Sequence, residues 1–398
     1  MAVARRNKID ERKVQGVRQL EKLLPLLEPL HGIGCERDKA GNRQLFMDQY
    51  CLLILLYFFN PIVSSLRGIQ QASELKKVQR RLGCPRASLG SLSEATQVFH
   101  SDLLAEIVGE LVDQLGKLPH DGRLDAVAQR LTAVDGTLLA KLPQITQAAW
   151  QTKRHPNGWR LHTHFEVLRG TAVRLALTDG RNRGDSNEKS VLRTMLEPDR
   201  CYIMDRGYEQ FSLFNAIVAS KSSYVCRIRG DHHFAPDEML PLSAAASRAG
   251  VVEDAIGALG SPRSERIEHP DHSVRVVRLQ TSRHPKRAGA AIENITLATN
   301  LLDVPADVLA LMYQHRWTIE LFFRFFKHVL GCRHLLSHDR VGIEIQTYCA
   351  IIVCLLISLW TGRKPTLRTF EMIQFYLSGW ADEEELLAHL EKLKQHDA

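Results

Sequence analysis

Two short apolar runs, each ending in an acidic residue, constrain what this 398-residue chain can fold into. Residues 131–134 lead into Asp135, and residues 201–204 lead into Asp205. Apolar runs of this length that stop at a turn signal are typical of buried strands, and a glycine follows each acid within two residues. The chain therefore predicts a sheet in which two strands present a carboxylate where they end.

Strands and helices alternate from residue 126 to residue 230. Strands are expected at 131–139, 159–168, 172–178, 201–205 and 224–229, and helices at 187–196 and 210–220. This order is the ribonuclease-H-like pattern, in which the first and fourth strands are neighbours, so that Asp135 and Asp205 would meet. The short connection between the second and third strands predicts an antiparallel pair. We expect an α/β fold built on a mixed five-stranded sheet with flanking helices.

A third acid lies in a polar row on a predicted helix. Tyr313, Arg316, Glu320 and Lys327 are separated by three, four and seven residues, so at about 100° per residue they share one helix face. Large apolar residues occupy the opposite face. One carboxylate, two cations and a phenol in this setting indicate a site for a phosphate or a metal. The alternative is an ordinary Arg316–Glu320 pair on an amphipathic helix.

These motifs resemble the signature of DDE transposases of the insertion-sequence-four type. Asp135 lies in VDGT, Asp205 in MDRGY, and Glu320 in a Y-x2-R-x3-E-x6-K pattern. The last motif is the specific one, because an Asp-Gly after a strand is common. The resemblance covers about residues 130–350.

The resemblance implies a role for each residue of these motifs. The three acids would hold two Mg²⁺ ions, which Mn²⁺ can replace, with Asp135 bridging both ions. Arg316 and Lys327 would hold phosphate oxygens, and Tyr313 would add a hydroxyl or a stacking surface. A pair of bound ions suits phosphodiester chemistry, because it activates the attacking oxygen and stabilises the leaving one.

Residues 1–125 are predicted to form a helical DNA-binding domain. A pattern like a capping box, Ser91-x-x-Glu94, is expected to open the helix that runs to residue 118. A basic cluster lies earlier, on one side of a helix. It consists of Lys76, Lys77, Arg80 and Arg81. The alternatives for this cluster are a solvated basic face and a contact with DNA phosphates, and the helix after Ser91 is a candidate for base readout.

The rest of the chain divides into three further segments. Residues 126–230 form the first part of the catalytic core, 231–300 a β-rich insertion before the last catalytic helix, and 301–398 the C-terminal helices of the core. Strands are expected at 273–280 and 294–299 of the insertion. The cations of this insertion have two interpretations: they contact a DNA strand along its length, or they form an exposed basic loop with no role. They are Arg275, Arg278, Arg283, Lys286 and Arg287.

Charge and composition agree with a nucleic-acid partner. The net charge is +7 and the pI near 9.0. His162 and His164 lack further partners at zinc-ligand spacing, so ordinary strand packing is expected. The apolar runs 50–59 and 348–360 are too short to cross a bilayer. Eight scattered cysteines and a charged N-terminal stretch indicate reduced thiols in the cytoplasm. The resemblance to transposases implies that the protein is associated with a bacterial nucleoid.

Three functions are compatible with these features. The first is a transposase that cuts double-stranded DNA at the terminal inverted repeats of an insertion sequence and joins the 3′-hydroxyl to target DNA, acting as a homodimer on DNA. The second is a ribonuclease-H-like nuclease without strand transfer. The third is a catalytically silent DNA-binding relative.

Overall fold

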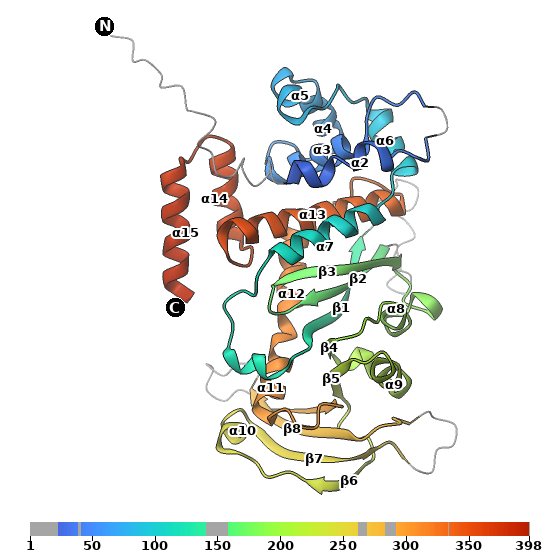
Figure 1. Ribbon diagram of the computed structural model, residues 1–398, viewed down its shortest axis with the longest axis vertical. Coiled ribbons are helices and arrows are strands. Elements are labelled where there is room, and N and C mark those ends of the chain that lie inside the picture. Colours follow the sequence, from blue (N-terminus) through green and yellow to red (C-terminus); the bar gives the residue numbers. More distant parts are fainter. Residues whose placement is uncertain are drawn as a thin grey trace. The chain divides into compact units, whose positions relative to one another are not determined.

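The computed structural model describes residues 23–38, 41–140, 158–261, 269–282, 292–332 and 334–397 (Figure 1). The chain divides into two compact units. One comprises residues 117–324, and the other comprises 1–116 together with 325–398. The division into four segments with separate roles, expected from the sequence, stays a prediction, because two compact units do not by themselves assign a role to any segment.

A nine-stranded sheet forms the centre of the 117–324 unit. Its strands are β1 (Arg130–Ala140), β2 (Gly158–Glu166), β3 (Thr171–Asp179), β4 (Arg200–Met204), β5 (Ser223–Ile228), β6 (Phe234–Met239), β7 (Val251–Leu259), β8 (Val274–Ser282) and β9 (Ile292–Thr299). The strand order is β3-β2-β1-β4-β5-β9-β8-β7-β6. The predicted neighbourhood of the first and fourth strands is confirmed.

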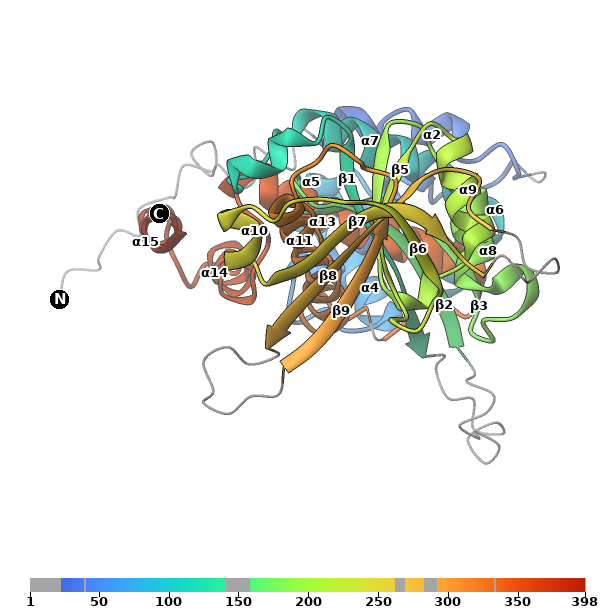
Figure 2. The ribbon, with the colours of Figure 1, turned by 90° about the horizontal axis from the view of Figure 1, so that it is seen from below.

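The prediction of a five-stranded sheet is wrong, because the insertion continues the same sheet. β9 pairs antiparallel with β5, from Val225 opposite Thr299 to Ile228 opposite Thr296. β8, β7 and β6 follow as an antiparallel series beyond β9, and Figure 2 shows them fanning out from β5. An edge strand presents unpaired amide and carbonyl groups, and here the insertion satisfies those of β5.

The register between β1 and β4 places the two aspartates side by side. The strands run parallel, and the last pair in register is Ala133 with Ile203. Asp135 and Asp205 have the same offset of 70 residues as that pair. Both acids therefore lie just beyond the paired segment, at the same end of neighbouring strands.

Helices cover both faces of this part of the sheet. In both views α8 (Glu188–Thr194) and α9 (Phe211–Ala219) lie on one side of β5, with α11 (Ala306–His315) on the other (Figures 1 and 2). Figure 1 shows α12 (Trp317–Arg324) on the same side as α11. The first face buries a cluster that includes Tyr202, Phe214 and Tyr224. On the second face, the rings of Phe165 and Phe322 lie 5.4 Å apart.

Four short helices complete the 117–324 unit. They are η2 (Gly122–Ala126), η4 (Gly184–Ser186), η5 (Arg206–Tyr208) and α10 (Ala244–Arg248). Among the insertion's cations, Arg275 is buried and binds Asp254 at 2.7 Å, and Arg278 pairs with Glu253 at 2.9 Å. Arg275 is therefore a structural residue and does not track DNA. Arg283, Lys286 and Arg287 lie outside the described residues.

The other unit is helical. Its described elements are α2 (Leu30–Ile33), α3 (Met47–Phe59), α4 (Leu66–Ser73), α5 (Lys76–Leu82), α6 (Leu89–Val98), α7 (Asp102–Gln114), the π-helical turn η6 (Phe325–Val329), α13 (Arg340–Thr361), α14 (Leu367–Leu377) and α15 (Glu383–Asp397). By length and composition α13 could cross a membrane, but 89% of its most apolar 18-residue window is buried. It packs against α3, α6 and α7, and this burial accounts for its apolar character.

The helix expected to open at Ser91 begins earlier. Ser88 is the N-cap of α6, and its Oγ accepts a hydrogen bond from the amide of Ser91 at 3.0 Å. The helix ends at Val98, and α7 begins at Asp102 as a separate element. The capping-box prediction at Ser91 is therefore wrong, because an equally suitable cap residue three positions earlier takes that role.

Burial of two histidines in β2 predicts acid sensitivity. Burial lowers the pKa of His162 to about 4 and that of His164 to about 3. The unfolded chain then binds protons more tightly, so each histidine should remove up to about 1 kcal/mol of stability per pH unit as pH falls from about 6.5 towards the folded pKa. Urea unfolding between pH 7 and 5 should show a shallower decline for His164→Phe than for the wild type.

An exposed histidine provides the control for this prediction. His338→Phe replaces an exposed histidine and serves as the control for the loss of an imidazole. His164 is 2% exposed, and neither of its ring nitrogens has a hydrogen-bond partner in the part of the chain that the structure describes. An unchanged decline in His164→Phe would contradict the assignment of this histidine as a buried neutral group.

Candidate active site

Asp135 is a half-buried carboxylate on β1. Its Oδ1 accepts a hydrogen bond from the amide of Gly136 at 2.8 Å. Burial raises the pKa of Asp135 to about 7, the nearby charge of Asp205 raises it further, and the Gly136 hydrogen bond and Arg316 oppose this. Partial burial and a neighbouring carboxylate both disfavour the charged form of Asp135, and the nearby positive charge does not fully compensate.

Asp205 begins the turn that follows β4. It is the N-cap of η5, and its Oδ1 accepts a hydrogen bond from the amide of Gly207 at 2.8 Å. The sequence Asp-Arg-Gly allows this turn because the glycine amide can approach the carboxylate without a side chain between them. One oxygen of each aspartate is thus bound to a backbone amide, and neither Oδ2 is used in these two bonds.

The helix that carries the third acid is interrupted. α11 ends at His315, α12 starts at Trp317, and the π-helical turn η6 begins at Phe325. The prediction of one uninterrupted α-helix through Lys327 is therefore wrong. A π-helix has a wider turn than an α-helix, so the α-helical period that placed Lys327 on the face of Glu320 does not apply through η6. Lys327 also belongs to the other compact unit.

Arg316 links the helix to the aspartates. Its guanidinium forms an ion pair with the carboxylate of Glu320, one helical turn later. The positive charge of Arg316 also acts on Asp135. The structure therefore brings Asp135 and Asp205 together directly, and it connects Glu320 to them through Arg316.

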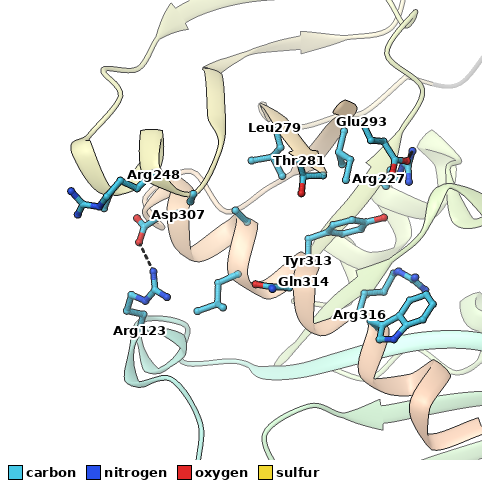
Figure 3. A pocket seen from close by; sticks show the side chains of 16 residues that line it. Arg123, Arg227, Arg248, Leu279, Thr281, Glu293, Asp307, Tyr313, Gln314 and Arg316 are labelled. Atoms are coloured by element: carbon cyan, nitrogen blue, oxygen red, sulfur yellow. Dashed lines mark hydrogen bonds and ion pairs between the residues drawn. The ribbon is translucent and has the colours of Figure 1, made fainter. Parts of the chain in front are cut away.

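Tyr313 is held by a second arginine that the sequence patterns did not identify. Arg227 of β5 hydrogen-bonds to the Tyr313 side chain, and its Nη2 binds Glu293 Oε1 of β9 at 2.8 Å. Burial raises the pKa of Tyr313, whereas Arg316 and Arg227 lower it. Figure 3 shows Tyr313, Arg227 and Glu293 along one wall of the site. A charged residue inside an otherwise apolar strand was the available signal.

An open pocket of about 920 Å³ adjoins this wall. Its cations are Arg123, Arg227, Arg248 and Arg316. Arg123 binds Asp307 of α11 at 3.3 Å, as the dashed line in Figure 3 marks. Trp317, which also lines the pocket, is half exposed. Several guanidinium groups around one hollow favour a ligand that carries phosphate groups.

The fit to a metal ion is partial. No group of three or more histidine, cysteine, aspartate or glutamate side chains stands ready to hold a metal within the described ranges. Asp135 and Asp205 supply oxygen donors of the kind that Mg²⁺ prefers. Glu320 is engaged by Arg316. Two of the three predicted ligands therefore lie at neighbouring strand ends, and the third is in an ion pair.

Removing the charge of Asp135 should stabilise the protein when divalent ions are absent. An aspartate has an ordinary pKa of 3.8, so the folded state holds its proton more tightly than the unfolded chain. Stability then falls as pH rises from about 4 to 7, and the full penalty applies above 7. We expect Asp135→Asn to be about 1–2 kcal/mol more stable than the wild type at pH 8, but not at pH 4.

Urea unfolding in EDTA at both pH values measures this difference. Asp237→Asn is the control, because Asp237 is exposed on β6 and its charge should not affect stability in this way. If Asp135→Asn were less stable than the wild type at pH 8, the half-buried aspartate would be supporting the fold and not a binding site.

The basic cluster of the N-terminal segment lies on α5. Lys76, Lys77 and Arg80 are exposed there, and the side chain of Arg81 lies outside the described residues. α5 belongs to the compact unit that comprises residues 1–116 and 325–398, whereas the pocket at Tyr313 is lined by residues of the 117–324 unit.

Paired carboxylates at the ends of parallel strands, with arginines beside them, favour an α/β protein that acts on phosphate groups. Residues 128–356 match the family described as the transposase DDE domain. This match covers more than half of the chain, so the chain belongs to the DDE transposase family.

Individual proteins show the same relationship. A putative transposase of Sinorhizobium fredii is 26% identical over 246 residues, which are 60% of this chain and 64% of that protein. A probable transposase for an insertion sequence element of Geobacillus stearothermophilus is 24% identical over 280 residues, 69% of this chain and 68% of that protein. The match thus spans less than two thirds of the Sinorhizobium protein.

A solved structure gives a weaker similarity. The piggyBac transposase, in a synaptic complex with hairpin DNA, has a TM-score of 0.43 and 8% sequence identity, covering 94% of this chain and 84% of that one. At this TM-score the similarity carries no argument about the site.

Proposed function

We propose that this protein is a transposase of the insertion-sequence-four type that cleaves DNA at the ends of its element and transfers the 3′-hydroxyl to target DNA. The observation that carries the proposal is the placement of Asp135 and Asp205 at the same end of two adjacent parallel strands, with Arg316 and Glu320 beside them. Membership of the DDE transposase family supports it.

The three acids are proposed to hold two Mg²⁺ ions, with Mn²⁺ as a substitute. When bound, the pair would supply activation of the attacking oxygen and stabilisation of the leaving oxygen. Asp135 and Asp205 would each offer the oxygen that the backbone amide does not engage. Glu320 would join them by leaving its ion pair with Arg316 and binding an ion instead. The guanidinium of Arg316 would then be available to a phosphate.

The cations around the acids are proposed to orient the DNA backbone. The positive charge of Arg316 acts on Asp135, so Arg316 would neutralise a phosphate bound beside that acid, where charge develops during cleavage. Tyr313, fixed by Arg227, would donate its hydroxyl to a phosphate oxygen. Lys327 is a proposed phosphate ligand from the motif.

Recognition of the element ends is proposed to involve a second surface. The exposed cluster on α5, made of Lys76, Lys77 and Arg80 with Arg81, would bind phosphates of the terminal inverted repeats. Two ends must be brought together for transposition, so we propose a homodimer on DNA. A protein acting on a bacterial chromosome would work in the cytoplasm at the nucleoid.

Incubation of the purified protein with a labelled element end, unlabelled target DNA and Mg²⁺ tests this function. Joined products support the transposase. Nicked or cut ends without joining would indicate a ribonuclease-H-like nuclease, and retention of the end without cleavage would indicate a catalytically silent relative. Omission of Mg²⁺ and its replacement by Mn²⁺ test the dependence on divalent ions.

A further inference from the structure

A fourth acid approaches the two aspartates from the other face of the sheet. Asp135 and Gly136 are consecutive in β1, so their Cα substituents point to opposite faces. Glu188 of α8 occupies the space on the Gly136 side. A Cβ built on Gly136 would lie 2.5 Å from Glu188 Oε1 and 3.2 Å from its Cδ. The missing side chain of Gly136 is therefore what allows this carboxylate to lie against β1.

Arg160 fixes the position of Glu188. Its Nη1 forms an ion pair with Glu188 Oε1, and both side chains are largely buried, with 19% and 18% exposed. Arg160 lies on β2, the strand that pairs with β1. Two elements of the sheet thus hold the carboxylate next to Asp135.

Capping of α8 does not explain this arrangement. An acid in the first turn of a helix usually faces water and the amides at the helix start. Here Asn187 is the N-cap, and its Oδ1 accepts a hydrogen bond from the amide of Lys189 at 2.9 Å. The carboxylate of Glu188 is turned back towards β1 and Arg160 instead.

The charge of Glu188 acts on both aspartates. Burial raises the pKa of Glu188, Arg160 opposes this, and Asp205 raises it further. Glu188 likewise contributes to the raised pKa of Asp135. Beyond Ala133, β1 is no longer paired with β4.

We propose that Glu188, seated by Arg160 and by the absence of a side chain at Gly136, is a positioning residue that strengthens divalent-cation binding by Asp135 and Asp205. It acts without touching the ion, in two ways. It adds negative potential behind the two ligands, and it cancels the charge of Arg160, which would otherwise repel a cation. This inference rests on the proposed function, because it requires a metal site at the two aspartates.

Titration of the full-length, DNA-free protein with Mn²⁺ tests the proposal without any reaction. Glu188→Gln keeps the shape and the hydrogen bond to Arg160 but removes the charge. We expect its Kd for Mn²⁺, measured by electron paramagnetic resonance, to rise about 10-fold, the range found for residues behind metal ligands. Asp185→Asn is the matched control. It removes the same charge from an exposed position three residues earlier and should leave the Kd unchanged.

A second pair of variants tests the geometry. Gly136→Ala places a methyl group 2.5 Å from Glu188 Oε1, closer than the two atoms can approach, so it should also weaken Mn²⁺ binding by displacing Glu188. Adding Glu188→Asp to Gly136→Ala shortens the acid by one methylene, and we expect part of the affinity to return. Circular dichroism and thermal unfolding check that each variant is folded.

The outcomes separate this inference from the proposed function. Loss of Mn²⁺ binding in Asp135→Asn with a wild-type Kd in folded Glu188→Gln overturns the role of Glu188 and leaves the metal site standing. Mn²⁺ binding that is indifferent to Asp135→Asn overturns the metal site and the inference together.

Discussion

Replacing Asp135 or Asp205 by asparagine, or Glu320 by glutamine, is expected to lower cleavage and strand joining by more than about 100-fold, beyond the cost of losing a residue behind a metal ligand. Each change removes a charge that the proposed ions need and alters the shape of the site little. Asp135 and Asp205 are close enough for their charges to interact, so losing either leaves a single aspartate between the strand ends.

Gel-shift and cleavage assays on the same labelled end measure this separation of binding from chemistry. Binding of the end should stay within about threefold of the wild type, because these acids contribute no favourable contact with phosphate. Asp237→Asn, on the exposed face of β6, serves as the control for the loss of one negative charge. A variant of any one acid that joins strands at the wild-type rate would show that its residue is misassigned.

Neutralising the basic cluster on α5 is expected to have the second large effect. Changing Lys76, Lys77, Arg80 and Arg81 to glutamine removes up to four phosphate contacts. The slope of log K against log salt for end binding should then fall by up to about 3 to 4 units. Affinity at low salt should drop steeply, whereas the metal-dependent chemistry on bound DNA should persist at saturating protein.

Binding isotherms between 50 and 200 mM salt measure this effect. Arg368→Gln with Lys392→Gln is a control that removes exposed positive charges from α14 and α15. The double variant Lys76→Gln with Lys77→Gln matches it in charge. Equal salt slopes in these two double variants would place end recognition elsewhere on the protein.

Local patterns predicted the core elements well. The five strands from β1 to β5 and the helices α8 and α9 lie where apolar periodicity placed them, within a few residues. The extension of the sheet was not predictable in this way. Pairing of β5 with β9 joins segments about 70 residues apart, and no pattern within either segment specifies its partner. The N-cap of α6 was also not predictable from local pattern, because Ser88 and Ser91 are both suitable N-cap residues and only the structure shows that Ser88 takes this position.

Part of the site was also accessible from the sequence. Asp135 and Asp205 were identified because each acid ends an apolar strand and the more specific Glu320 motif accompanies them, and their neighbourhood follows from the strand order. The interruption at Arg316 and the π-helical turn were missed because the apolar period continues through both. Glu188 and Arg227 gain their positions from neighbours on other elements, which a single helix or strand does not reveal.

The continuous ladder from β5 into the insertion has a mechanical consequence. A separate lobe on a flexible linker can swing towards a ligand. Here β9 is hydrogen-bonded to β5 along Val225 to Ile228, and β5 lies between β9 and β4, the strand that leads into Asp205. The insertion therefore moves only if the central sheet twists with it, so strain applied by DNA at the outer strands would reach the strand ends that carry Asp135 and Asp205. Excising the insertion would not give a smaller working enzyme. It would expose the amide and carbonyl groups of β5 as a template for aggregation.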